Sequence, residues 1–163
     1  MLVTRGTETF RPDFGGTRLS RANLERANLR GAKAQFVDFR EANLGRASLV
    51  GTLLQGADLS RANLQSADLS KAELKAVRLD GSNLCGAHLH DARDLSQSQL
   101  QGAFGDAATT LPDGLERPGH WMNTHLDEVG SVLEWRKWLS DPDGYTPLDP
   151  IDDAQAARMS SRA

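Results

Sequence analysis

Apolar residues recur every five positions over about half of the chain. Seventeen positions lie five apart from Phe14 to Asp94, and fifteen of them hold Leu or Phe. A small residue, usually Ala, precedes most of them by two positions. Residues five apart lie about 140° apart on an α-helix, and they alternate between the two faces of a β-strand. The pattern therefore predicts short extended segments, each with an inward Ala and an inward Leu, that are joined by corners.

A corner is predicted two positions after each of these apolar residues. Glycine turns the backbone at little cost, and it often occupies the corner: Gly16, Gly31, Gly51, Gly56, Gly81 and Gly86. Four segments per turn give a square cross-section and a second period of twenty residues. Four asparagines follow that period, namely Asn23, Asn43, Asn63 and Asn83, and we expect them to stack as a ladder. Opposite charges also fall twenty apart, in the pairs Asp13 with Lys33 and Glu73 with Arg93.

Runs such as ADLSRANLQSADL (57–69) resemble the pentapeptide repeat family. The resemblance covers residues 12–95 and implies an all-β solenoid, a right-handed quadrilateral β-helix. The period of twenty gives it about four coils, and the residues after it predict an α-helical C-terminal cap. Two departures from the repeat are visible. Ala34 stands where a Leu belongs, with Phe36 nearby, so we expect a local bulge. Leu95 comes one position late, which indicates the end of the coil.

The pattern divides the chain into four parts: an N-terminal lead-in (1–11), the β-helix (12–95), a helical C-terminal cap (96–141) and a flexible acidic tail (142–163). Ser96 and Gln99 have the spacing of a capping box, so a short helix is predicted to begin at Ser96 and to end at Gly105. Residues 95–121 resemble a tail that follows pentapeptide repeats in other bacterial proteins, and this resemblance implies no activity.

A longer helix is predicted over 124–139, with Asn123 or Thr124 as its N-cap. Its apolar side chains cover more than the single stripe that packing against the end of the coil requires. The predicted interaction residues are Leu126, Val129, Leu133, Trp135, Trp138 and Leu139. Two interpretations stay open: the same helix of a second subunit covers the surplus in a homodimer, or the whole helix is buried in the cap.

Composition limits the compartment and the chemistry. Cys85 is the only cysteine, which excludes an internal disulfide and favours a reducing compartment. The first residues lack the apolar stretch of a signal peptide, and no stretch is long and apolar enough to span a bilayer. We therefore expect a cytoplasmic protein without membrane contact.

Two groups of residues are candidates for chemical sites. Cys85, His88 and His90 have a spacing that could hold zinc, but solvated histidines fit a repeat that places polar residues outward. His120, Trp121 and His125 are expected to serve packing, because no nucleophile motif or phosphate-binding glycine loop accompanies them. The sequence predicts no enzyme, no metal and no cofactor.

The charge of the coil helps to choose between two hypotheses, a mimic of duplex DNA and a protein-interaction module. The family includes mimics of duplex DNA that occupy or protect DNA gyrase. Residues 12–93 hold twelve Lys and Arg against nine Asp and Glu, whereas residues 94–163 hold five against twelve. A coil about 20 Å long would need roughly twelve excess negative charges to match DNA, so the coil has the wrong sign.

Basic residues occupy five corners, namely Arg21, Arg26, Arg46, Arg61 and Lys71. Interleaved acids such as Glu41 and Asp58 should pair with them, and nucleic acid is not the expected partner. The sequence therefore favours a non-enzymatic protein-interaction or scaffold module with an unknown protein partner. The alternative is a DNA gyrase or topoisomerase effector of the DNA-mimic type that protects against gyrase inhibitors.

Overall fold

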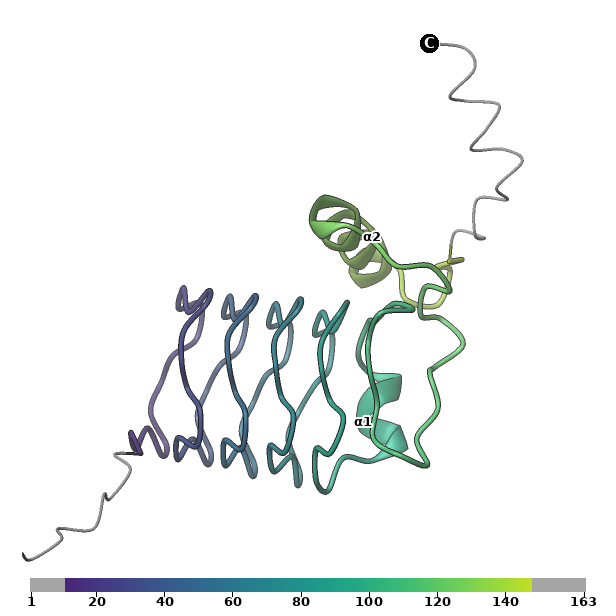
Figure 1. Ribbon diagram of the computed structural model, residues 1–163. Helices are drawn as coiled ribbons and strands as arrows, with labels where there is room; N and C mark the ends of the chain where they lie inside the picture. Colours follow the sequence, from purple (N-terminus) through teal and green to yellow (C-terminus); the bar gives the residue numbers. More distant parts are fainter. Residues whose placement is uncertain (1–10, 148–163) are drawn as a thin grey trace, which may run out of the picture.

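Residues 11–147 are described by the computed structural model, and residues 11–93 wind into a column of stacked coils (Figure 1). Each coil takes twenty residues, because parallel backbone bridges join positions twenty apart from Asp13↔Lys33 to Glu73↔Arg93. Two hydrogen bonds support each bridge. For example, the Leu24 N–H donates to the Asn43 carbonyl at 2.7 Å, and the Asn43 N–H donates to the Ala22 carbonyl at 2.9 Å. The predicted period of twenty is confirmed.

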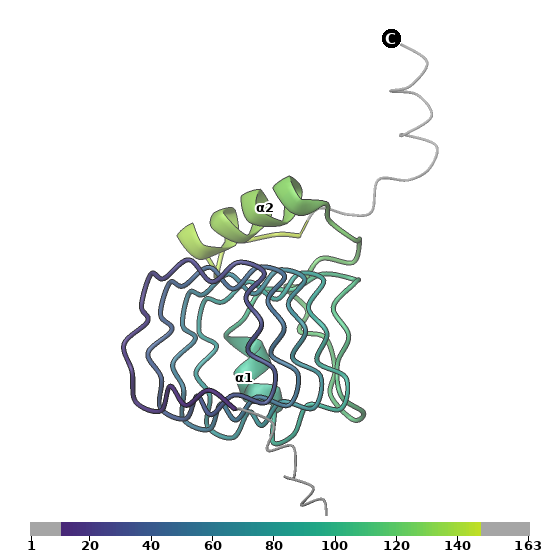
Figure 2. The same cartoon turned by 60° about the vertical axis from the view of Figure 1, so that its left-hand side comes forward.

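The inward Ala and Leu positions form the core of the column. Leu44, Leu64 and Leu84 have exposed fractions of 0%, so they lie inside the column. The coils of the column have a four-sided outline (Figure 2). Only about three residues lie between corners, so each side contributes isolated bridges, and no continuous strand occurs within residues 11–147. Burial of this apolar column is the main stabilising contribution to the coil.

Every corner from Gly16 to Asp91 has a positive φ, between 54° and 73°. The six glycines predicted at corners are among them, and ten corners hold other residues. A residue with a Cβ is strained in this left-handed region by about 1 kcal/mol or more. The coil holds these residues there because the inward side chains on both flanks are buried.

Replacing Ala76 by glycine is expected to stabilise the protein. Ala76 is an exposed corner residue with a φ of 56°, and glycine relieves its strain, so the gain should be about 0.5–1 kcal/mol after the entropic cost of glycine. Ala72→Gly is the matched control, because Ala72 is buried and points inward; that change should destabilise by about 1–2 kcal/mol. Urea unfolding measures both, and a loss of stability in Ala76→Gly would contradict the strain argument.

The bulge expected near Ala34 does not occur. The Ala34 N–H donates to the Leu53 carbonyl at 2.8 Å, and the bridge Lys33↔Leu53 keeps the register. Phe36 occupies the corner with a φ of 57° and a 73% exposed side chain. Its ring lies against Gly56, where a Cβ would come within 2.6 Å of it. The prediction was wrong because the pentad gains no residue: Ala34 faces inward as a Leu would.

Helix α1, Gln97–Gln101, follows the last regular bridge. The capping box is confirmed: Ser96 accepts from the Gln99 N–H, and the Gln99 side chain accepts from the Ser96 N–H. The helix ends with Gly102 as its C-cap, and not at Gly105 as predicted. It stops early because the Phe104 N–H already donates to the Ser82 carbonyl at 2.9 Å.

The segment 102–121 closes the C-terminal end of the column as an irregular further coil. Bridges join Asn83 to Phe104 and His88 to Thr110. Leu100, Ala103 and Trp121 are buried in the same core as the leucines of the coils. The apolar axis is therefore covered at this end.

Helix α2, Glu128–Ser140, begins later than predicted, with Asp127 as its N-cap in place of Asn123 or Thr124. The Gly130 N–H donates to Asp127 Oδ1 at 2.7 Å. The helix lies along a lateral side of the column and not over its end (Figure 2). Neither helix within residues 11–147 has the length and apolar character to cross a bilayer. Most of the predicted lead-in (1–10) and of the predicted acidic tail (148–163) lies outside the described residues.

Candidate interaction surface

One side of the column, which we call the Asn face, carries Asn23, Asn43, Asn63 and Asn83. Their carboxamides form the predicted ladder: each Nδ2 donates to the Oδ1 of the preceding coil, at 3.5, 3.1 and 3.2 Å in order. The same oxygens accept backbone N–H groups two residues on, such as that of Gly45 at 3.2 Å. These paired bonds hold the amides in one orientation, so the face is rigid.

Helix α2 crosses the Asn face diagonally (Figure 2). At its start, Glu128 Oε2 lies 2.7 Å from Arg46 Nη2. Toward its end, the Trp135 indole N–H donates to the Gly81 carbonyl at 2.8 Å. Arg46 and Gly81 lie at opposite edges of the face, and the C-terminal half of α2 covers the last coil. Asn83, which is bridged to Phe104 of the closing segment, is 0% exposed.

Stacked rings anchor the C-terminal half of α2. The Trp138 ring stacks with Phe104, at a centroid distance of 5.6 Å, and with His120, at 5.3 Å. Tyr145 meets Phe104 edge-on at 5.7 Å, and its hydroxyl donates to Glu134 Oε2 at 3.2 Å. Burial raises the pKa of Tyr145, and the Glu134 carboxylate adds to the rise. Stacked and edge-to-face arrangements are the favourable geometries of aromatic pairs, so these contacts stabilise the position of α2.

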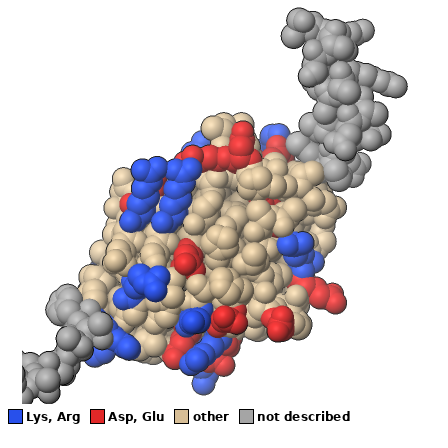
Figure 3. Space-filling view, viewed as in Figure 1, with Lys and Arg blue, Asp and Glu red and all other residues tan. Residues whose placement is uncertain are grey.

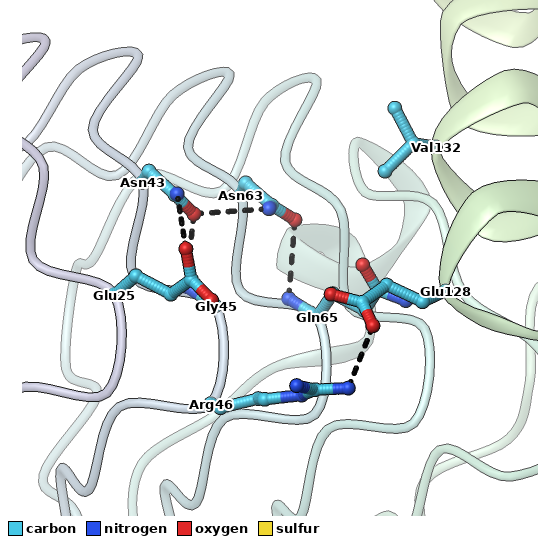
Figure 4. A pocket seen from close by; sticks show the side chains of 8 residues that line it. All are labelled: Glu25, Asn43, Gly45, Arg46, Asn63, Gln65, Glu128 and Val132. Atoms are coloured by element: carbon cyan, nitrogen blue, oxygen red, sulfur yellow. Dashed lines mark hydrogen bonds and ion pairs between the residues drawn. The ribbon is translucent and has the colours of Figure 1, made fainter.

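The N-terminal half of α2 stands off the coil and leaves a cavity of about 120 Å³ (Figure 4). It is lined by Glu25, Asn43, Gly45, Arg46, Asn63, Gln65, Glu128 and Val132. Figure 4 shows the Glu25 carboxylate turned toward Asn43, whose Nδ2 lies 3.5 Å from Glu25 Oε2. Ligand sites typically occupy about 300–1,000 Å³, so this cavity suits water or a small ion better than an organic ligand.

The six predicted interaction residues of the helix take different places. Trp138 is buried, and Leu126, Trp135 and Leu139 are half-buried against the aromatic rings. Val129 and Leu133 are 67% and 53% exposed. The surplus apolar face is thus reduced to two side chains one turn apart. A homodimer through this helix remains a prediction.

The five predicted basic corners do not form one edge. Arg21 and Arg61 share an edge with Glu41, Arg26 and Arg46 share the next, and Lys71 lies on a third. Arg21 Nε is 3.0 Å from Glu41 Oε2, Arg26 Nε is 3.8 Å from Glu25 Oε1, and Arg46 pairs with Glu128. Acidic groups are interleaved with basic ones on the side shown in Figure 3.

Ion pairs also lie on the side of the column next to the Asn face. Arg40 donates to Asp38 at 2.9 and 2.8 Å, and these hydrogen bonds lower the pKa of Asp38 to about 2. In the following coils, Arg78 Nη1 lies 3.5 Å from Asp58 Oδ2. The charges of this side are largely compensated within the column.

The fold separates Cys85 from His88 and His90. Cys85 is buried beside Phe104, and burial, together with the Asp106 carboxylate, raises the pKa of its thiol. His88 and His90 lie on the next side of the column, with ring centroids 6.4 Å apart. Within residues 11–147, no group of three or more His, Cys, Asp or Glu side chains could hold a metal ion.

The histidines after the coil serve contacts within the fold. His120 Nε2 lies 2.7 Å from the Ala103 carbonyl, which also accepts the Trp121 indole N–H at 2.8 Å. His125 Nδ1 lies 3.5 Å from Asp106 Oδ2. These contacts have the packing role that the sequence favoured for His120 and Trp121.

Asp106 connects the coil, the closing segment and α2, and the sequence did not single it out. Its carboxylate is 0% exposed. Oδ1 accepts the Gly86 N–H at 2.9 Å and the Thr109 N–H at 3.1 Å, and Oδ2 accepts the Leu126 N–H at 3.1 Å. The available signal was its spacing, because Asp106 follows the corner Gly86 by twenty residues.

Stacked five-residue segments with inward Ala and Leu define a β-helical solenoid of pentapeptide repeats. The chain belongs to the pentapeptide repeat family: the family model "Pentapeptide repeats" matches eight copies over residues 13–46, 42–81 and 67–104, together more than half of the chain. Membership implies a right-handed β-helix. No curated protein matches the chain.

Solved structures of pentapeptide repeat proteins are similar to this chain. A protein of the Arabidopsis thaliana thylakoid lumen is 31% identical over 61% of this chain and 81% of its own, with a TM-score of 0.45. Rfr23 from the cyanobacterium Cyanothece 51142 is 26% identical over 69% and 81%, with a TM-score of 0.49. QnrB1, a plasmid-mediated fluoroquinolone resistance protein, is 18% identical over 81% and 65%, with a TM-score of 0.36.

Proposed function

We propose that this protein is a non-enzymatic protein-binding scaffold. The observation that supports the proposal is the fixed register of the column's outward side chains, which backbone bridges repeat every twenty residues from Asp13 to Arg93. Such a surface presents side chains at constant spacing and loses little entropy on binding. Pentapeptide repeat proteins are generally structural or interaction modules.

The DNA-mimic alternative requires a different property of the same surface. It needs a continuous excess of negative charge. The Asn face is uncharged along its ladder, and the neighbouring side pairs Asp38 with Arg40 and Asp58 with Arg78. The observations therefore favour a protein-binding surface over imitation of duplex DNA.

Photo-crosslinking distinguishes the two hypotheses. A benzophenone amino acid replaces Lys33, Arg78 or His88, which are exposed outward residues on the three sides that α2 leaves free, or Leu133 on α2. A scaffold should crosslink one defined protein from adjacent positions and leave gyrase supercoiling unchanged in a parallel titration. Crosslinks to gyrase together with loss of supercoiling would support the alternative. No defined adduct from any position would contradict the scaffold.

A further inference from the structure

The first coil, residues 11–30, leaves the interior of the column open. Its inward residues Ala22 and Leu24 are partly exposed, whereas Ala42 and Leu44 one coil later are 0% exposed. Within residues 11–147, no element stacks on the outer side of this coil (Figure 1). The N-terminal end therefore differs from the C-terminal end, where Trp121 closes the axis.

The same coil has a backbone edge that is unpaired within residues 11–147. In later coils, the residue before each inward Leu uses its N–H and its carbonyl to bond the preceding coil, as Asn43 does with Ala22 and Leu24. The equivalent residues of the first coil are Asp13, Arg18, Asn23 and Asn28. Their N–H and carbonyl groups have no hydrogen-bond partner within the described part of the chain. Such an edge is a template for an additional strand.

Positive charge is concentrated around this edge. Residues 11–30 contain five arginines, which are Arg11, Arg18, Arg21, Arg26 and Arg30, against two acidic residues. All five are exposed. Three of them, Arg11, Arg18 and Arg30, form no ion pair within residues 11–147. The next coils are close to neutral, with three against two charges in 31–50 and one against two in 51–70.

We propose that the open first coil binds an extended, acidic segment of a partner protein by edge-on strand addition. The inference rests on the proposed protein-binding function and names its partner class. The segment's backbone would pair with one side of the free edge, its apolar side chains would cover the inward leucine of that side, Leu19 or Leu24, and its carboxylates would face the neighbouring arginines. Affinity would come from main-chain bonds, and specificity from the alternation of acidic and apolar residues.

Charge and hydrogen-bonding capacity argue against other occupants. Two copies meeting at this end would bring two arginine-rich rims together, and like charges across an interface are costly. A DNA backbone offers phosphate acceptors but no donors for the free carbonyls. The chain's own residues 2–10 contain one acidic residue, Glu8, against Arg5, so they supply no acidic excess.

Fluorescence anisotropy with the full chain tests the proposal. The probe is a labelled short peptide in which Asp alternates with Leu and Val. The control peptide has the same sequence, but alternate backbone amides are N-methylated. The double variant Arg18→Glu/Arg30→Glu should weaken binding at least about tenfold. Arg78→Glu is the matched control, because Arg78 occupies the position of Arg18 on the same side in the fourth coil. It should change affinity by less than about twofold.

N-methylation should abolish binding to the unaltered protein, because it removes the peptide's edge donors. Retained binding would reduce the site to charge attraction and overturn strand addition, as would failure of the acidic peptide to bind. Three other results would contradict an acidic protein segment as the partner. Single-stranded DNA could bind as tightly as the peptide, or deletion of residues 2–10 could make the peptide bind markedly more tightly. The protein could also form a dimer that Arg18→Glu dissociates. If the photo-crosslinking experiment yields a defined protein only from other sides of the column, the proposed scaffold function would be supported and the proposed site on the first coil would be wrong.

Discussion

Replacing Trp121 by alanine is expected to lower the free energy of unfolding by about 3–5 kcal/mol. The side chain is 1% exposed and belongs to the core that the leucines of the coil form. Its ring lies so close to Gly105 that a Cβ there would come within 2.5 Å. Alanine would therefore open the C-terminal end of the apolar axis to water and leave a cavity that the closing segment cannot fill.

Urea unfolding followed by circular dichroism measures the loss, and hydrogen exchange shows where it begins. The Leu84 and Leu89 N–H groups donate to carbonyls of the closing segment, at Phe104 and Thr110. They should lose protection first in Trp121→Ala. Trp135→Ala is the control, since its half-buried side chain lies on α2; it should cost less and leave the Leu89 amide protected. A loss below about 1 kcal/mol would show that α1 alone closes the column.

The two ends of the column have different requirements. Each repeat contacts only its neighbours, so a terminal coil needs a cover of its own. Trp121 and Leu100 supply that cover at the C-terminal end. Within residues 11–147, the first coil keeps Leu19 and Leu24 partly exposed and its backbone edge without a hydrogen-bonded neighbour. This asymmetry is the reason that we assign partner binding to the N-terminal end and stability to the C-terminal end.

The sequence predicted the coil because one local rule repeats there. The same alternation sets the inward and outward positions of every pentad. The inward position of Leu44 and the outward position of Asn63 could therefore be predicted without knowledge of any long-range contact. The period of twenty then followed from four corners per turn. Even the atypical pentad at Ala34 obeys the rule.

The position of α2 could not be predicted in the same way. Amphipathic spacing shows that a helix buries one stripe, but it does not name the surface that covers the stripe. Here that surface comes from contacts far apart in the chain, between Arg46 and Glu128 and between Gly81 and Trp135. The late start of the helix has a similar cause: the Leu126 N–H is held by Asp106, so Asp127 becomes the cap.

Replacing Asp106 by alanine is expected to destabilise the protein by about 3–5 kcal/mol, because it leaves several buried N–H groups without an acceptor. Asp106→Asn keeps one oxygen but turns an amide donor toward the others, so its cost should be intermediate. Asp113→Ala removes the same charge from an exposed turn of the same segment and should cost less than about 0.5 kcal/mol.

Hydrogen exchange at Gly86 and Leu126 reports directly on the bonds to Asp106, and near-ultraviolet circular dichroism reports on the stacking of Trp138 with Phe104. If Asp106 joins α2 to the coil, Asp106→Ala should lose both signals while the Leu44 amide stays protected by its bond to Asn63. Loss of amide protection with an unchanged aromatic spectrum would mean that the stacked rings hold α2 by themselves. The carboxylate would then stabilise the closing segment only, and the connection between helix and coil would belong to Trp135 and Trp138.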